Sequence, residues 1–333
     1  MSLDPASGAT ATGTVASGGP PAHRPLPRLP AVDLARGLAI VGMVIYHTAF
    51  DLYAEGLIAT DVDNDLAWTV LARTVAGAFL VLVGVGLVLA RYNGIAWPRY
   101  WRRVGFIAAG AVAVSVATWF FDSDTFVYFG ILHEIAVASV LALPFLSAPW
   151  WLVAPVAAVI IAAPWFLTSP IFDSPALWWL GLSTDVRSTL DYVPLLPWFG
   201  IVLVGILVGR IIVRQAAAVA TWRLDDPVSR LLRFAGRWSL VIYLVHQPLI
   251  FGLVHLTAVT FPPSPALTRA HFVNECKAAV CENGGANCFG YCGCLFDNLY
   301  GTDLYPPRRA EDLSAAQAAR QNGIVAECHA EWP

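Results

Sequence analysis

Apolar residues recur along the chain in long stretches that are separated by short polar loops. A helix of about 20 such residues crosses the roughly 30 Å hydrocarbon core of a bilayer. The pattern therefore predicts an all-α integral membrane protein, a bundle of about seven transmembrane helices. We place the spans at residues 31–53, 66–90, 103–121, 126–147, 150–168, 194–214 and 238–260.

The composition favours a membrane protein over a soluble one. Only 13% of the 333 residues are charged, whereas 57% are hydrophobic. A soluble domain carries about 25% charged residues, because water must wet its surface. The composition excludes soluble enzyme classes, and the net charge of −3 gives no bias toward nucleic acid as a partner.

Two segments outside the spans have a different composition. Residues 1–27 are rich in Ala, Gly, Ser, Thr and Pro, so we expect a disordered tail and no cleavable signal peptide. Residues 264–333 contain all six cysteines and have the composition of a small helical domain outside the membrane. The membrane domain between them covers residues 28–260.

Charge alternates between the loops. Basic residues gather before the first span and in the loops after the second and sixth spans, whereas most acidic loop residues lie on the other side. Basic loops stay in the cytoplasm, so the N-terminus is expected inside and residues 264–333 outside. For a bacterial inner membrane, this orientation places the Cys-rich domain in the periplasm. The basic loop residues include Arg28, Arg91, Arg99, Arg102, Arg103, Arg214, Arg230, Arg233 and Arg237.

The cysteines predict disulfide bonds. An even number of cysteines in a small domain outside the cytoplasm is typical of a disulfide framework, and six cysteines allow 15 pairings. The alternative is a zinc site with His271 or His329, but the cysteine spacing matches no familiar zinc pattern. We therefore expect no metal. The six residues are Cys276, Cys281, Cys288, Cys292, Cys294 and Cys328.

The first span contains four ionisable residues, namely Asp33, Arg36, His47 and Asp51. Such residues are costly inside a membrane and usually face a cavity or a partner. At 100° per residue, Arg36 and His47 differ by about 20° around the helix and lie roughly 16 Å apart along it. The four residues therefore form one stripe from the inner surface into the outer half of the bilayer.

Three further spans carry polar groups at a comparable depth. They are Arg73 in the second span, His133 and Glu134 in the fourth, and Tyr243 and His246 in the seventh. Each group alone could serve helix packing, but their shared depth predicts a functional cavity. Histidine beside a carboxylate and arginine suits acyl transfer, with histidine as general base or acyl carrier, and it also suits proton-coupled transport.

Three sequence blocks resemble the heparan-alpha-glucosaminide N-acetyltransferase catalytic-domain family, in its bacterial branch. They are RLPAVDLARGLAIVGM at 28–43, FGILHEIA at 129–136 and SLVIYLVHQP at 239–248. The spacing from Arg36 to His47 is also similar to the first-helix motif of membrane acyltransferases that O-acetylate surface polysaccharides. In animal members of the first family the active histidine lies in the following external loop, but residues 54–66 contain none. His47 or His133 would have to replace it.

The resemblance implies a transmembrane acyltransferase with acetyl-CoA as the donor. The acceptor would be an amino or hydroxyl group of an external saccharide or glycolipid. We expect Asp33, Arg36, Arg102 and Arg103 at the donor phosphates, because arginine suits phosphate recognition. For the chemistry we expect His47 as base or acyl carrier, Asp51 or Glu134 orienting a histidine, and Arg73 at the oxyanion. His133, Tyr243 and His246 would line the acceptor pocket.

Two other functions fit the same residues. A proton-coupled transporter could relay protons through Glu134 and the histidines, although no pair of repeat-related broken helices is visible. A membrane scaffold could instead bind a partner through the Cys-rich domain. Neither the acceptor nor the oligomeric state follows from the sequence.

Overall fold

The computed structural model describes residues 26–186, 188–215, 226–280, 286–306 and 313–332. Most of the predicted N-terminal tail and Cys281 therefore lie outside the described residues. Helices are the regular secondary structure of the described residues, which contain no strand beyond an isolated bridge between Phe129 and Tyr192. The prediction of an all-α membrane protein is confirmed.

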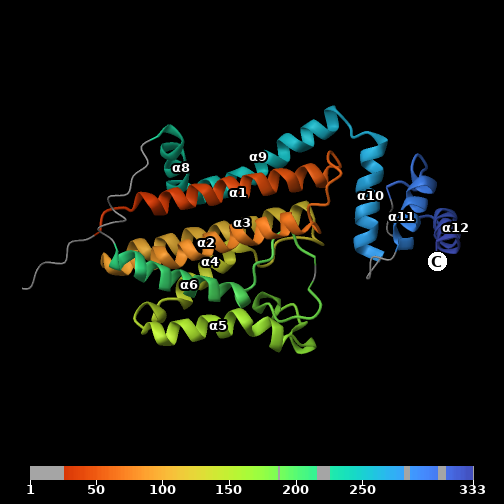
Figure 1. Cartoon of the computed structure of the whole chain (residues 1–333). Helices are drawn as coiled ribbons and strands as arrows, with labels where there is room; N and C mark the ends of the chain where they lie inside the picture. Colours follow the sequence, from red (N-terminus) through yellow and green to blue (C-terminus); the bar gives the residue numbers. More distant parts are fainter. Residues whose placement is uncertain (1–25, 187, 216–225, 281–285, 307–312, 333) are drawn as a thin grey trace, which may run out of the picture.

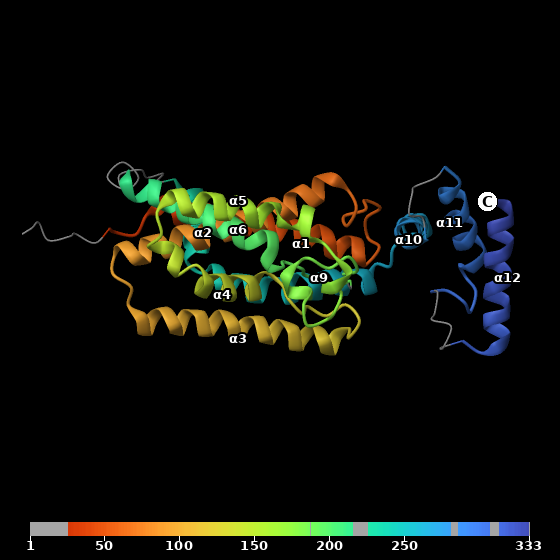
Figure 2. The same cartoon turned by 90° about the horizontal axis from the view of Figure 1, so that it is seen from below.

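Six helices among the described residues are long and apolar enough to cross a membrane. They are α1 (Pro30–Ala54), α2 (Leu66–Tyr92), α3 (Trp97–Phe121), α5 (Trp150–Leu167), α6 (Leu195–Arg214) and α9 (Ser239–Thr260). They lie side by side in a bundle (Figures 1 and 2). Many large apolar side chains on the outside of the bundle are exposed, such as Phe106, Phe120 and Phe166, which suits contact with lipid.

The fourth predicted span, 126–147, is shorter than expected. It forms α4 (Ile131–Leu141), an 11-residue helix, followed by the 3-10 turn η1 (Pro144–Leu146). Pro144 lacks the N–H group that would continue the helix. Residues 122–130, on the other side of α4, approach the loop before α6, where the N–H of Val193 donates to the carbonyl of Phe129 at 3.1 Å.

The bundle packs most tightly between α2 and α6. Leu80 of α2 and Val202, Leu203 and Ile206 of α6 are completely buried in one apolar cluster. Ile131 and Ala138 of α4 join the same cluster. The interior of the bundle is therefore an apolar core, and polar residues inside it stand out.

Two further groups of helices occupy opposite ends of the bundle. Helix α8 (Pro227–Arg237) runs across the bundle axis beside the start of α1, and α10 to α12 lie at the other end (Figure 1). The remaining elements are η2 (Pro170–Phe172), η3 (Trp178–Leu180), α10 (Pro265–Val280), α11 (Ala286–Leu299) and α12 (Ala315–Glu331).

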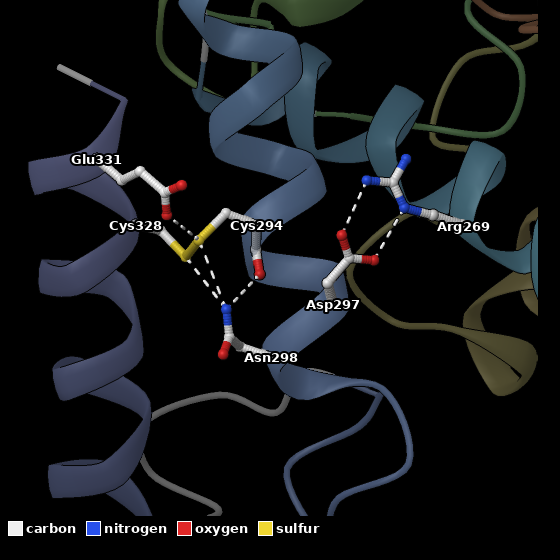
Figure 3. Close-up of a disulfide and its surroundings, with 6 residues drawn as sticks. All are labelled: Arg269, Cys294, Asp297, Asn298, Cys328 and Glu331. Atoms are coloured by element: carbon white, nitrogen blue, oxygen red, sulfur yellow. Dashed lines mark hydrogen bonds and ion pairs between the residues drawn. A yellow bond between two sulfur atoms is a disulfide. The ribbon is translucent and has the colours of Figure 1, made fainter.

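Disulfides join the helices of the Cys-rich segment. Cys276 of α10 is bonded to Cys292 of α11, and Cys294 of α11 to Cys328 of α12. Figure 3 shows the second bond next to the ion pair of Arg269 with Asp297. Cys288 is disulfide-bonded as well. The zinc alternative needed Cys288, Cys292 and Cys294 as thiolates, and disulfide formation removes that possibility.

Candidate functional site

A cavity of about 350 Å³ lies at the α8 end of the bundle. Among the described residues, four arginines from four segments of the chain line it: Arg28, Arg36, Arg103 and Arg237. Apolar side chains of α2 and α4 form part of the remaining wall. The cavity combines a positive charge with apolar walls, so it suits a ligand that carries both anionic and apolar groups.

Asp33 holds two of these arginines in place. One oxygen of its buried carboxylate lies 3.6 Å from Nη1 of Arg36, and the other lies 3.4 Å from Nε of Arg237. One carboxylate cannot neutralise four guanidinium groups, so the lining keeps a net positive charge that attracts multivalent anions.

Two glycines bring α8 close enough for this contact. A Cβ atom on Gly37 would overlap the carbonyl oxygen of Leu232, and one on Gly236 would overlap the carbonyl oxygen of Asp33. Only glycine permits such an approach of two helix backbones. The position of Arg237 at the cavity therefore depends on glycine in both α1 and α8.

The prediction for the donor site needs one correction. Arg36 and Arg103 do line the cavity, but Arg102 does not, and its guanidinium lies 5.6 Å from the centre of the Phe106 ring on the same helix. Neighbouring helix residues point about 100° apart, and in α3 it is the side of Arg103 that faces the cavity. The sequence interpretation missed Arg28 and Arg237, which it counted as loop residues.

Two histidines from distant spans meet inside the bundle. The rings of His47 in α1 and His246 in α9 lie edge to face, with centroids 5.0 Å apart. Nδ1 of His246 lies 2.7 Å from the carbonyl oxygen of Tyr243. A carbonyl only accepts, so Nδ1 carries the proton in this contact. Nε2 is buried, has no hydrogen-bond partner among the described residues, and is left with a free lone pair.

Tyr243 connects this histidine pair to the arginine cavity. Its side chain lines the cavity, and its ring centroid lies 5.7 Å from that of His246. Tyr243 and His246 lie three residues apart and are therefore neighbours on one face of α9. The histidine pair and the cavity are thus separated by about one helical turn.

Asp51 contacts a neighbour of the histidine pair rather than a histidine. Its Oδ1 accepts a hydrogen bond of 2.9 Å from Nε2 of Gln247, the residue that follows His246. The other carboxylate oxygen is buried without a partner among the described residues. Asp51 therefore ties α1 to α9 beside the histidines, and the contact predicted between Asp51 and a histidine is replaced by one with Gln247.

His133 is held at the start of α4. Its Nδ1 accepts a hydrogen bond from the backbone N–H of Gly130 at 3.2 Å, and its Nε2 lies 3.3 Å from Oγ of Ser115. Both ring nitrogens are engaged in contacts that position the helix. These contacts favour a structural role for His133 over the acceptor-pocket role expected from the sequence.

Glu134 is completely buried on the core side of α4. Neither of its carboxylate oxygens has a hydrogen-bond partner in the described part of the chain. It lies on the same helix face as Ile131 and Ala138, which pack in the apolar cluster of α2 and α6. An isolated buried carboxyl group of this kind is most stable in its neutral form.

Arg73 lies away from the histidines. It is exposed on α2, whereas Leu71 and Val75 on the same helix approach Gly42 of α1. Arg73 lies two positions from both Leu71 and Val75, so its side chain is rotated by about 200° around the helix from theirs. Arg73 therefore points away from α1, and its position does not support the predicted oxyanion role.

Asp191, in the loop before α6, holds the start of α4, whose first residue Ile131 lines the cavity. Its Oδ2 accepts a hydrogen bond of 2.9 Å from the backbone N–H of Ile131 and so caps α4. Burial raises the pKa of this carboxyl group to about 6. A Cβ atom on Gly130 would overlap the same carboxylate oxygen. Nothing in the local sequence distinguished Asp191 from the other acids of the loops predicted to lie outside.

Comparison with known families matches the region that contains both sites. The family model described as heparan-alpha-glucosaminide N-acetyltransferase, catalytic, matches residues 28–248. The match includes the four cavity arginines and both histidines, and it confirms the resemblance of the three sequence blocks. No curated protein sequence and no solved structure matches the chain.

Proposed function

Because the chain belongs to the heparan-alpha-glucosaminide N-acetyltransferase catalytic family, we propose that it is a transmembrane acyltransferase. It takes an acyl group, by preference acetyl, from acetyl-CoA on the cytoplasmic side. The acceptor is an amino or hydroxyl group of a saccharide or glycolipid on the other side. The observation that carries this proposal is the arginine-lined cavity, which shares Tyr243 with the histidine pair.

In this proposal the phosphates of the donor bind to Arg28, Arg36, Arg103 and Arg237. Charge-assisted hydrogen bonds from arginine to phosphate are strong and fix the orientation of the ligand. Asp33 keeps Arg36 and Arg237 ordered before the donor arrives. The pantetheine arm and its thioester then extend along α1 and α9 toward His47 and His246.

The chemistry takes place at the histidine pair. Nε2 of His246 removes the proton from the acceptor hydroxyl or amine, and the acceptor oxygen or nitrogen attacks the thioester carbonyl. The carbon–sulfur bond breaks, and the CoA thiolate leaves and takes up the proton. The alternative is that His47 first carries the acetyl group. In both routes Asp51 and Gln247 fix the distance between α1 and α9.

The two ends of the bundle support a direction for the proposed reaction. The cavity end carries the basic loops and faces the cytoplasm, so the donor enters there. Helices α10 to α12 lie at the opposite end, in the periplasm of a bacterial inner-membrane protein. This is the compartment in which their disulfides persist.

Two neighbouring arginines provide the test of the donor site. Arg103→Gln removes a guanidinium that lines the cavity, whereas Arg102→Gln removes one from the preceding residue, which does not line it. Losing a charged hydrogen bond costs about 1.5–3 kcal/mol, or roughly a 10- to 100-fold loss of affinity. We expect that loss of acetyl-CoA binding to the purified protein for Arg103→Gln only. Absence of acetyl-CoA binding by the unsubstituted protein, or equal losses in both variants, would overturn the proposal.

Glu134 favours a second function, proton-coupled transport. A fully buried carboxyl group without a partner among the described residues is a candidate proton carrier within a membrane. Transport by reconstituted protein that needs no acetyl-CoA and is lost in Glu134→Gln would support this function. Two results together would exclude transport. Acetyl transfer would be unchanged in Glu134→Gln, and vesicles containing the unsubstituted protein would show no proton flux.

A further inference from the structure

Helix α8 has three sides with different surroundings. Ser229 and Gly236 are buried, and together with Leu232 they lie within about 60° of one another around the helix. This side packs against the backbone of α1 at Asp33 and Gly37. The apolar residues and the arginines of α8 must therefore point elsewhere.

The second side is apolar and exposed. Val228 is 66% exposed, Leu231 67% and Phe234 59%, and Trp238 directly after the helix is 53% exposed. We call these four residues the α8 stripe. A contiguous apolar stripe of this kind is unfavourable in water, and on a short helix with a strongly basic face it is typical of a membrane-surface helix.

The position of α8 agrees with the plane of a membrane surface. It runs across the axis of the bundle at the end where α1 begins (Figure 1). The membrane-spanning helix α9 starts at Ser239, immediately after Trp238. The α8 stripe therefore lies at the level at which the spanning helix α9 enters the bilayer.

The third side is basic. Arg230, Arg233 and Arg237 lie within about 60° of one another. Arg230 is exposed, and Arg237 reaches Asp33 at the arginine cavity. Asp226, the N-cap residue, accepts a hydrogen bond from the backbone of Ser229, and α8 itself (Pro227–Arg237) contains no acidic residue. The net positive charge of α8 complements anionic lipid headgroups.

We propose that α8 is an interfacial helix that inserts the α8 stripe into the headgroup region of an anionic bilayer. On its arginine side, Arg230 and Arg233 bind the lipid phosphates, whereas Arg237 stays at the cavity. This inference does not depend on the acyltransferase proposal. Because Gly236 and Arg237 belong to both α8 and the cavity wall, lipid binding also holds α8 against α1 and keeps Arg237 beside Asp33.

Site-directed spin labelling of the full chain in lipid nanodiscs tests the depth of the stripe. Nitroxide labels are placed at Leu231→Cys in the stripe and at Ala278→Cys, an exposed position on α10 at the opposite end. Unsubstituted protein gives the labelling background. With phosphatidylglycerol present, we expect the label at 231 to be accessible to oxygen and protected from a water-soluble nickel chelate. The label at 278 should show the opposite pattern.

Two results would overturn the proposal. The first is a label at 231 that is as accessible to the nickel chelate as the label at 278. The second is an unchanged depth at 231 when phosphatidylglycerol is replaced by phosphatidylcholine, which would exclude a role of the anionic headgroups.

A stability measurement gives an independent check. Leu231→Glu with Phe234→Glu should lower the melting temperature in phosphatidylglycerol nanodiscs, because charged side chains then occupy the stripe. The control Val280→Glu changes a similarly exposed apolar residue of α10, away from the inner end of the bundle, and should have little effect. Equal effects of the two changes would contradict the proposal.

Discussion

His47 and His246 lie edge to face with their ring centroids 5.0 Å apart, although they come from the first and last helices of the bundle. The Asp51–Gln247 hydrogen bond joins the same two helices beside them. The hydrogen bond from His246 to the Tyr243 carbonyl fixes the ring orientation. This arrangement places Nε2 of His246, which has no hydrogen-bond partner in the described part of the chain, in the interior of the bundle. The histidine pair is therefore the first target for mutation.

Replacing either histidine should remove acetyl transfer while leaving donor binding intact. General acid–base catalysis contributes about 100-fold or more to a rate. We therefore expect His47→Ala and His246→Ala each to lower transfer from labelled acetyl-CoA in membranes by at least that factor. The control is His255→Ala, which changes an exposed histidine paired with Glu55 at the end of the bundle near α10. Full activity of both pair variants would remove the histidines from the mechanism.

Gly236 should not tolerate a side chain. A Cβ atom there overlaps the carbonyl oxygen of Asp33, so Gly236→Ala must push α8 away from α1. We expect a melting temperature several degrees lower and weaker acetyl-CoA binding, because Arg237 leaves the cavity. Gly252→Ala in α9 is the matched control, since a Cβ atom at Gly252 meets no atom within 4 Å. Equal melting temperatures of the two variants would show that the close approach of Gly236 to Asp33 does not matter for stability.

Tyr53 should hold the Cys-rich helices against the bundle. Its buried hydroxyl donates a hydrogen bond of 2.9 Å to a carboxylate oxygen of Glu275 in α10, and its ring lies beside that of His271. Tyr53→Phe loses about 1 kcal/mol of interaction. Amide hydrogen exchange in α10 should become faster, whereas Tyr300→Phe, in an exposed tyrosine directly after α11, should leave it unchanged. Unchanged exchange in Tyr53→Phe would show that other contacts dock α10.

Asp191 should make the stability depend on pH. Burial raises its pKa from 3.8 to about 6, so the folded state resists ionisation. Its contribution to the free energy of unfolding is therefore complete below about pH 4, and it is lost as the pH rises through 6.

Asp191→Asn removes this titration but keeps an oxygen that accepts the hydrogen bond from Ile131. We expect the variant and the unsubstituted protein to melt at similar temperatures at pH 4, and the variant to melt higher at pH 7.5. Asp185→Asn, in an exposed residue of the same loop, should melt at the same temperature as the unsubstituted protein at both pH values. A variant that melts lower at both pH values would mean that the carboxylate caps α4 in its ionised form.

The sequence by itself determined the architecture of the membrane region. Long apolar runs form helices in a bilayer because each backbone polar group must find its partner within the same segment. Six of the seven spans could therefore be placed within a few residues, α3 beginning earlier than expected because Trp97 and Pro98 start the helix. The one-face stripe of Asp33, Arg36 and His47 followed from helical geometry alone, and so it was also predictable.

Only the tertiary structure decided how these residues combine. That Arg103 lines the cavity and Arg102 does not depends on what α3 packs against. The contributions of Arg237 and Asp191 depend on how α8 and the loop before α6 fold back onto α1 and α4. The pairing of Cys276 with Cys292 depends on how α10 and α11 pack. Each contact joins segments far apart in the chain, and local periodicity carries no information about such pairs.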